Sequence, residues 1–440
     1  MKKEIVFNFL DAPPGAGKTT TIIKHVIEKA QERAIQDNNK RFLIVTPYLK
    51  EVQDICAVTP CIQPVGTKTQ EIKELIRQEK DICCTHALFL LFDRETLRLL
   101  KDSPKDYELI IDEELSVISP ITDRARVYSS DKDLPKRIII FALKDFSLAC
   151  DANLLQKTED NLLKWNYSHD YSKDKEKSLF DEIEKRTHLY DLFEDDKSAV
   201  IQVMKRETWE SFSSVTFCSY RMKESYLAYY CQLQNIKIKW LHLDNSQAIT
   251  EGYLDVKPEG LDRIEIFTTD SPNNVNQRNY ELLHGVSYSK SWYQKNIDLK
   301  TGQLSEAARA LRNEFRNWRN RAMPKGQRNN YYWTSYKGFE DSLTDLHLSK
   351  KKWIPCNQKA TDDYADCIAV GYLINRFPNV SLDHFLKRRG IKVNQKEIAL
   401  SEFIQFLWRS NIRVKDSKEK IFAFVPSKQL YDSFLDWRGY

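Results

Sequence analysis

The first part of the chain alternates short apolar runs with stretches whose apolar residues recur at helical spacing. The runs at 4–10, 42–46, 81–85 and 107–111 predict buried strands. After the first run, the isoleucines and the valine between residues 22 and 27 predict a helix with one apolar face. Strands that alternate with helices are typical of an α/β fold built on a parallel sheet.

Similar but weaker patterns return in the second half of the chain. The predicted elements there are strands at 263–268, 331–334 and 421–425 and helices at 304–321, 363–377 and 399–413. This alternation predicts a second parallel-sheet domain. The chain has 440 residues, more than the roughly 250–300 at which one hydrophobic core stops growing. We therefore predict two domains, 1–255 and 256–440, with a charged, helix-rich insertion at about 120–210 in the first.

Composition excludes several classes of protein. With 41% hydrophobic and 30% charged residues, the chain is globular rather than disordered. No apolar run approaches the ~18 residues that span a bilayer, so we expect no membrane partner. Nine cysteines without a secretion signal favour free thiols in the cytoplasm. The net charge of +5 permits a nucleic-acid partner but does not require one.

The most informative local pattern joins the first predicted strand to the first predicted helix. There the sequence APPGAGKTT has the order of strand, glycine-rich loop and helix that a phosphate-binding loop requires. Gly15 and Gly17 let the backbone wrap around phosphate oxygens. Lys18 is predicted to reach the β- and γ-phosphates, and Thr19 to place its hydroxyl on Mg²⁺. The predicted nucleotide-binding residues are Pro14, Gly15, Ala16, Gly17, Lys18, Thr19 and Thr20.

A second pattern supplies the acidic partner of this loop. The apolar run at 107–111 ends in Asp112 and Glu113, as a Walker B strand does. We predict that Asp112 holds Mg²⁺ and that Glu113 orients and polarises the water that attacks the γ-phosphate. A carboxylate directly after the metal-binding aspartate favours hydrolysis over nucleotide binding alone.

In the order and spacing of these motifs the chain resembles superfamily 2 helicases and translocases, in a DEEx variant. APPGAGKTT resembles motif I, with Ala12 where glycine is usual, and IIDEEL resembles motif II. Between them, FLIVTPYL and the Thr-His pair after the next strand resemble motif Ia and the element that follows it. The resemblance implies two RecA-like P-loop NTPase domains in tandem, with ATP and Mg²⁺ as ligands. ATP is assumed from the resemblance, because no upstream glutamine is present to read adenine.

The resemblance also implies a nucleic-acid face on both domains. Thr46, Pro47, Thr85 and His86 follow strand ends and would donate to backbone phosphates. Thr361 occupies the place of motif V. Each of these residues also has an ordinary structural interpretation that remains open. Thr46 and Pro47 can form a turn that ends a strand, His86 can be a solvent-exposed histidine at a strand end, and Thr361 can cap a helix. The insertion is either a wedge or clamp for nucleic acid or a solvated decoration.

Near the end of the chain, ALSEFIQFLWRSNIR resembles motif VI and the tails of helicase-like proteins of phages and prophages. Ser401, Gln405, Arg409 and Arg413 recur every four residues and are predicted to form one stripe on a helix. By resemblance, Gln405, Arg409 and Arg413 are catalytic and reach the γ-phosphate. Trp408 replaces the usual glycine, and the arginines are four residues apart where three is common, so the identity of the arginine finger stays open. A helix whose arginines are merely solvated also stays open.

Three further segments carry weaker patterns. The strand at 215–219 is the best candidate for motif III. Basic residues interleaved with aromatics between 306 and 331 predict a groove that tracks a nucleic-acid backbone, or otherwise a solvated helix face. Cys56, Cys61, Cys83 and Cys84 have poor spacing for an iron–sulfur cluster, and free thiols are favoured.

The leading hypothesis is an ATP-dependent helicase or translocase that acts on single-stranded or partly duplex nucleic acid, with DNA favoured. Replication or recombination proteins are possible partners. The alternative from another class is a nucleotide-gated DNA-binding or loading protein with ATPase activity but no processive unwinding. A P-loop kinase is a third interpretation, disfavoured by the long second half.

Overall fold

The computed structural model describes residues 4–35, 39–121, 124–128, 138–142, 155–166, 187–191, 200–356, 363–377 and 379–439. Two compact units divide the chain. The first unit comprises Met1–Ala12, Gly17–Asp255 and Asn379–Val393, and the second comprises Pro13–Ala16, Val256–Pro378 and Asn394–Tyr440. No helix among the described residues is long and apolar enough to cross a membrane.

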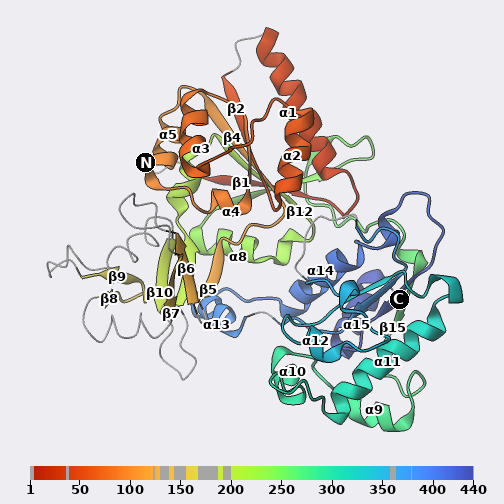
Figure 1. The fold of residues 1–440 in the computed structure, drawn as a ribbon. Coiled ribbons are helices and arrows are strands. Elements are labelled where there is room, and N and C mark those ends of the chain that lie inside the picture. Colours follow the sequence, from red (N-terminus) through yellow and green to blue (C-terminus); the bar gives the residue numbers. More distant parts are fainter. Residues whose placement is uncertain are drawn as a thin grey trace. The chain divides into compact units, whose positions relative to one another are not determined.

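The first unit is built on a seven-stranded sheet (Figure 1). Its strands in spatial order are β14 Ile249–Glu251, β13 Lys237–Leu243, β1 Val6–Asp11, β12 Ser214–Ser219, β4 Asp106–Asp112, β2 Lys40–Thr46 and β3 Ile82–Thr85. Neighbours pair in parallel except for β13 and β14. The predicted strands of the first half are confirmed, and because they run parallel their carboxyl ends lie at one edge of the sheet.

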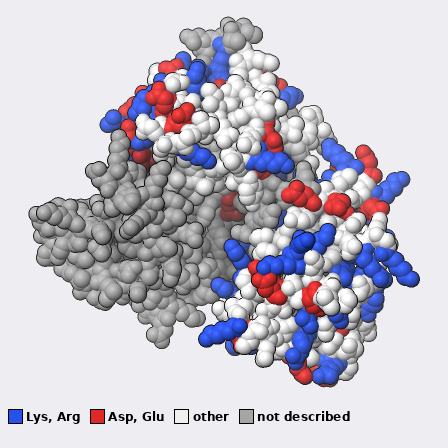
Figure 2. All heavy atoms as spheres, in the orientation of Figure 1, with Lys and Arg blue, Asp and Glu red and all other residues white. Residues whose placement is uncertain are grey.

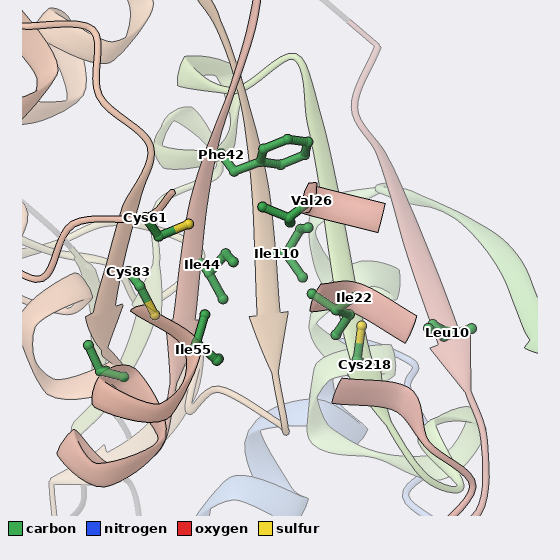
Figure 3. Packing of buried hydrophobic residues seen from close by; sticks show 11 residues of the cluster. Leu10, Ile22, Val26, Phe42, Ile44, Ile55, Cys61, Cys83, Ile110 and Cys218 are labelled. Carbon is green, nitrogen blue, oxygen red and sulfur yellow. The ribbon is translucent and has the colours of Figure 1, made fainter. Parts of the chain in front are cut away.

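Helices cover this sheet and bury its apolar runs. They are α1 Lys18–Ile35, α2 Leu49–Val58, α3 Lys68–Arg77, α4 His86–Phe89, α5 Arg94–Lys101 and α8 Tyr226–Gln234. Ile22 and Val26 of α1 and Ile55 of α2 pack with Phe42 and Ile110 of the sheet in one buried cluster (Figure 3). Such burial stabilises the unit by roughly 1.5–3 kcal/mol for each large apolar side chain.

The described residues of the insertion lie mainly in strands, apart from short turns and a 3-10 helix at Arg206–Ser211. These strands are β5 Ile118–Ile121, β6 Arg124–Tyr128, β7 Ile138–Ala142, β8 Leu155–Lys157, β9 Leu163–Trp165, β10 Thr187–Asp191 and β11 Val200–Met204. The prediction of helices is wrong for these residues, because β-branched runs such as that of β11 favour strands. Helix α13, Val380–Arg388, contacts β5 and β11 although it comes from the second half of the chain.

The second unit is a four-stranded parallel sheet in the order β15 Ile264–Phe267, β18 Ile421–Phe424, β17 Ala369–Tyr372 and β16 Tyr331–Thr334. Its helices are α9 Gln277–Leu283, α10 Lys290–Asn296, α11 Glu306–Ala322, α12 Glu340–Leu343, α14 Gln395–Leu407 and α15 Lys428–Arg438. The three strands predicted in this half are confirmed by β15, β16 and β18, and α11 confirms one of the helices.

Two predictions for the second unit are wrong. The range 363–377 contains strand β17 and no helix. The prediction of a helix is wrong because β17 is a fully buried central strand, and its continuous apolar run cannot be distinguished from a buried helix by periodicity alone. The aromatic residues of the predicted basic groove, Phe315 and Trp318, are buried and cannot stack on bases. Figure 2 shows lysine and arginine side chains interspersed with acidic ones over the described residues of one face.

Candidate functional site

The phosphate-binding loop follows β1 and leads into α1, as the sequence predicted. Gly15 and Gly17 have φ angles of +81° and +86°, a left-handed conformation that glycine adopts without steric cost. A Cβ on Gly17 would lie 2.8 Å from the Oε1 atom of Gln247, the far end of a flexible side chain that can move aside, so the φ angle is what favours glycine at this position. The amide of Thr21 donates to Gly17 O at 2.9 Å and begins the helix.

Lys18 and Thr19 make polar contacts within the first unit. The Lys18 side chain is largely buried, and its Nζ donates to Ala12 O at 2.7 Å. The Thr19 hydroxyl donates to Asp112 Oδ2 at 2.8 Å. The structure therefore brings together the loop and the carboxylate that the sequence predicted as partners in a magnesium site.

Asp112 is a buried carboxylate at the end of β4. Burial, followed by the charge of Glu113, raises the pKa of Asp112 to about 6, and the Thr19 hydroxyl and the Lys18 charge oppose that shift. Since burial disfavours the anion, a cation beside it would be stabilising. Mg²⁺ prefers oxygen ligands and is usually held by one or two protein groups together with phosphates and water, which fits Thr19 and Asp112.

Glu113 has an unusual backbone conformation, with φ at +65°. Its amide donates to Cys218 O at 2.8 Å, and the Ser219 hydroxyl donates to Glu113 Oε2 at 3.2 Å. Both partners belong to the end of β12, the motif III candidate, which lies between β1 and β4. Sequence reasoning pointed to this strand but did not predict the contact of Ser219 with Glu113.

Asp11, at the end of β1, is a polar residue that sequence reasoning missed. Its two carboxylate oxygens accept from the amides of Arg221 and Met222, each at 2.9 Å. Burial raises the pKa of Asp11 against the influence of these hydrogen bonds. Asp11 thereby holds the segment after β12 next to the end of β1. The sequence feature that could have identified Asp11 is its position at the end of the strand before the phosphate-binding loop.

The predicted nucleic-acid residues of the first half lie at the same edge of the sheet, where Thr46 and Thr85 are paired in the register of β2 and β3. Thr46 is buried, and its hydroxyl donates to Tyr48 O at 3.3 Å. Pro47 follows it and is half-buried. The Thr85 hydroxyl accepts from Leu88 N at 3.3 Å and caps α4. The ring of His86 contacts Asp112 O at 2.9 Å.

The second-half residues do not form the predicted stripe. Helix α14 ends at Leu407, where the Ser410 hydroxyl donates to Leu407 O at 2.7 Å and satisfies a carbonyl at the helix end. Gln405 contacts Ser401 within the helix, at 3.4 Å. Arg409 and Arg413 lie beyond the helix.

These two arginines differ in exposure. Arg409 is only 6% exposed, lies over the Phe406 ring and donates to Cys356 O at 3.4 Å, whereas Arg413 is partly exposed. Thr361 lies outside the described residues. Within the described ranges, no three histidine, cysteine or acidic side chains are grouped to hold a metal ion, and the four cysteines between 56 and 84 are free thiols.

Among the comparisons with known proteins, the match to a family model lies in the second half of the chain. Residues 260–438 match the family of the YonV C-terminal Rossmann-like domain. The parallel sheet of the second unit agrees with that description, so the chain is a mixed α/β protein with a Rossmann-like domain. A "SPbeta prophage-derived uncharacterized protein YonV" of Bacillus subtilis (strain 168) is 25% identical over an alignment of 450 positions that covers 97% of each chain.

One solved structure, "Structure of S. tokodaii Xpd4", is similar over 98% of this chain and 94% of that chain, with 12% sequence identity. Its TM-score of 0.44 is too low to establish a shared fold.

Proposed function

We propose that the chain is an ATP-dependent motor on nucleic acid, a helicase or translocase with two RecA-like domains. The observation that carries this proposal is the hydrogen bond between Thr19 and Asp112, which joins the phosphate-binding loop to the acidic end of β4. A glycine-rich loop at a helix N-terminus binds phosphates through its amides. The carboxylate next to it suits hydrolysis of the bound nucleotide.

The residues of the phosphate-binding loop and of the end of β4 have separate roles in this proposal. Lys18 would leave Ala12 O to contact the β- and γ-phosphates, and Glu113 would orient the attacking water. Thr19 and Asp112 would hold Mg²⁺, which when bound neutralises charge on the phosphates. The backbone N–H groups from Gly15 to Thr20 would line the polyphosphate, whereas Pro14 has no N–H and would only shape the loop.

The second half would supply the group that stabilises negative charge on the transferred phosphoryl. A guanidinium must expose its donors to contact a phosphate, and Arg413 is more exposed than Arg409. We therefore assign the arginine finger to Arg413 before Arg409, with Gln405 as an additional polar contact.

Nucleic acid, with DNA favoured, would lie across the strand ends that carry Thr46, Pro47 and Thr85, and Thr361 would contribute from the second half. The similarity to a prophage-derived protein fits a phage origin, and the partners proposed for such a motor are replication or recombination proteins.

Phosphate release with and without single-stranded DNA tests the motor. We expect ATP hydrolysis that DNA stimulates, and a rate that is indifferent to DNA and RNA would contradict the proposal. The alternative, a nucleotide-gated loading protein, would hydrolyse ATP yet displace no strand from a duplex. A strand-displacement assay with the same protein distinguishes the two.

A further inference from the structure

We propose that His86 is a positioning residue for the two carboxylates at the end of β4, and not a contact to the nucleic-acid strand. This inference rests on the proposed function, since it assigns to Asp112 and Glu113 the roles given above. It concerns one peptide group, the one that joins these two residues.

His86 reaches this peptide across a neighbouring strand. It is the first residue of α4, directly after β3, and β2 lies between β3 and β4 in the sheet. Strand β2 ends at Thr46, so the imidazole can pass the end of β2 and contact Asp112 O at 2.9 Å. A carbonyl oxygen only accepts hydrogen bonds, and the His86 ring therefore carries a proton on Nε2.

The same peptide is held at its other polar atom. The carbonyl of Asp112 and the amide of Glu113 belong to one planar unit. Its oxygen accepts from His86, and its N–H donates to Cys218 O at 2.8 Å. Two hydrogen bonds from different strand ends thus fix the rotation of this plane.

That rotation sets the direction of both acidic side chains. On one side of the peptide, Asp112 accepts from the Thr19 hydroxyl. On the other side, Glu113 has a φ of +65°, which a non-glycine residue adopts only when its surroundings hold it there. Since Nε2 of His86 is used in this contact, the imidazole acts on hydrolysis through the peptide.

Steady-state ATP hydrolysis by His86→Ala and His86→Gln tests this role, with His347→Ala as a matched control because His347 is exposed in the second unit. We expect His86→Ala to lower kcat about 10- to 100-fold, since small misplacements of catalytic groups have effects of this size. The KM for ATP and the affinity for single-stranded DNA should stay within about two-fold. His86→Gln should recover much of kcat, because its carboxamide N–H can donate to the same carbonyl.

Three results would overturn the inference. The first is a loss of DNA affinity in His86→Ala with kcat unchanged, which would make the imidazole a strand contact. The second is a kcat for His86→Gln as low as that for His86→Ala, which would show that the hydrogen bond is not what matters. The third is a wild-type ¹⁵N-histidine spectrum, assigned with His86→Gln, in which the ring is protonated only at Nδ1.

The spectrum also separates this inference from the proposed function. A wild-type chain that hydrolyses no ATP would overturn the motor and, with it, the role of His86 in hydrolysis. The protonated Nε2 would still appear in that case, so the two failures have different signatures.

Discussion

The Thr19 hydroxyl donates a 2.8 Å hydrogen bond to Asp112 Oδ2 and so connects the first turn of α1 with the end of β4. Ninety-three positions separate the two residues in the sequence. Their contact follows from the sheet, in which β12 alone separates β1 from β4. It brings a hydroxyl and a buried carboxylate together beside a loop suited to phosphate.

Asp112→Asn should stabilise the metal-free protein while it abolishes ATP hydrolysis. The pKa of Asp112 is about 6 in the folded chain, above its ordinary value of 3.8. Asp112 therefore binds more protons in the folded state than in the unfolded state between pH about 4 and 6, and its contribution to wild-type stability falls as pH rises through that window. At pH 8 the substitution should raise the free energy of unfolding by roughly 1–3 kcal/mol.

Melting temperatures in EDTA, measured from pH 4.5 to 8, check this prediction. The gain from Asp112→Asn should shrink as the pH falls below about 6, because the wild-type carboxyl then becomes neutral. A gain that is the same at every pH would contradict the buried charge as its cause.

Glu113→Gln should bind nucleotide but lose turnover. The amide is nearly isosteric, and its Oε1 can still accept from the Ser219 hydroxyl, so the fold should be retained. It cannot act as a base toward water, and we expect a loss of roughly 10²–10⁴-fold in kcat. Binding of a fluorescent ATP analogue and phosphate release measure the two properties.

The neighbouring Glu114→Gln is the control for this substitution. Glu114 Oε1 accepts from Leu227 N at 3.1 Å, which is a contact within the fold. Glu114→Gln should keep most of the hydrolysis rate. If both variants hydrolyse ATP normally, the assignment of Glu113 is wrong.

Gly371→Ala should destabilise the second unit. Gly371 lies in β17, and a Cβ there would collide with the Phe315 ring of α11. Added atoms in a packed core cost about 1–3 kcal/mol. Gly326→Ala is the matched control, because a Cβ on Gly326 would meet no atom within 4 Å. Thermal unfolding of the full-length chain compares the two, and equal melting temperatures would contradict the packing of α11 on β17.

Cys56 should react with iodoacetamide before its three neighbouring cysteines. A hydrogen bond from Cys83 lowers the pKa of Cys56, which is only half-buried. Burial raises the pKa of Cys61 to about 12 and also raises that of Cys84. Because the thiolate is the reactive form, mass spectrometry should find the label first on Cys56. Cys83→Ala should slow this labelling, and faster labelling of Cys84 than of Cys56 would refute the prediction.

The parts of the site that the sequence predicted are local ones. Positions 15 and 17 carry glycine because the backbone there has positive φ angles. Lys18 and Thr19 follow these glycines at the spacing that is typical of a phosphate-binding loop. Apolar runs before Asp11 and Asp112 likewise predict buried strands whatever their neighbours are.

The parts that the sequence did not predict depend on distant contacts. The pairing of β12 with both β1 and β4 decides that Ser219 meets Glu113, and no local pattern contains that pairing. The prediction that Arg409 and Arg413 share a helical stripe is wrong because α14 ends at Leu407, where the Ser410 hydroxyl donates to the Leu407 carbonyl. Such a hydrogen bond from a side chain to the backbone can end a helix, and the spacing of apolar residues does not reveal it.

The central claim is that the loop ending in Lys18 binds a nucleoside triphosphate for hydrolysis. The most direct test compares ATP hydrolysis by the wild-type chain and by Lys18→Ala, with Lys24→Ala as the control because Lys24 is exposed on the same helix. We predict that Lys18→Ala abolishes phosphate release while Lys24→Ala retains it. Undiminished hydrolysis by Lys18→Ala would contradict the account.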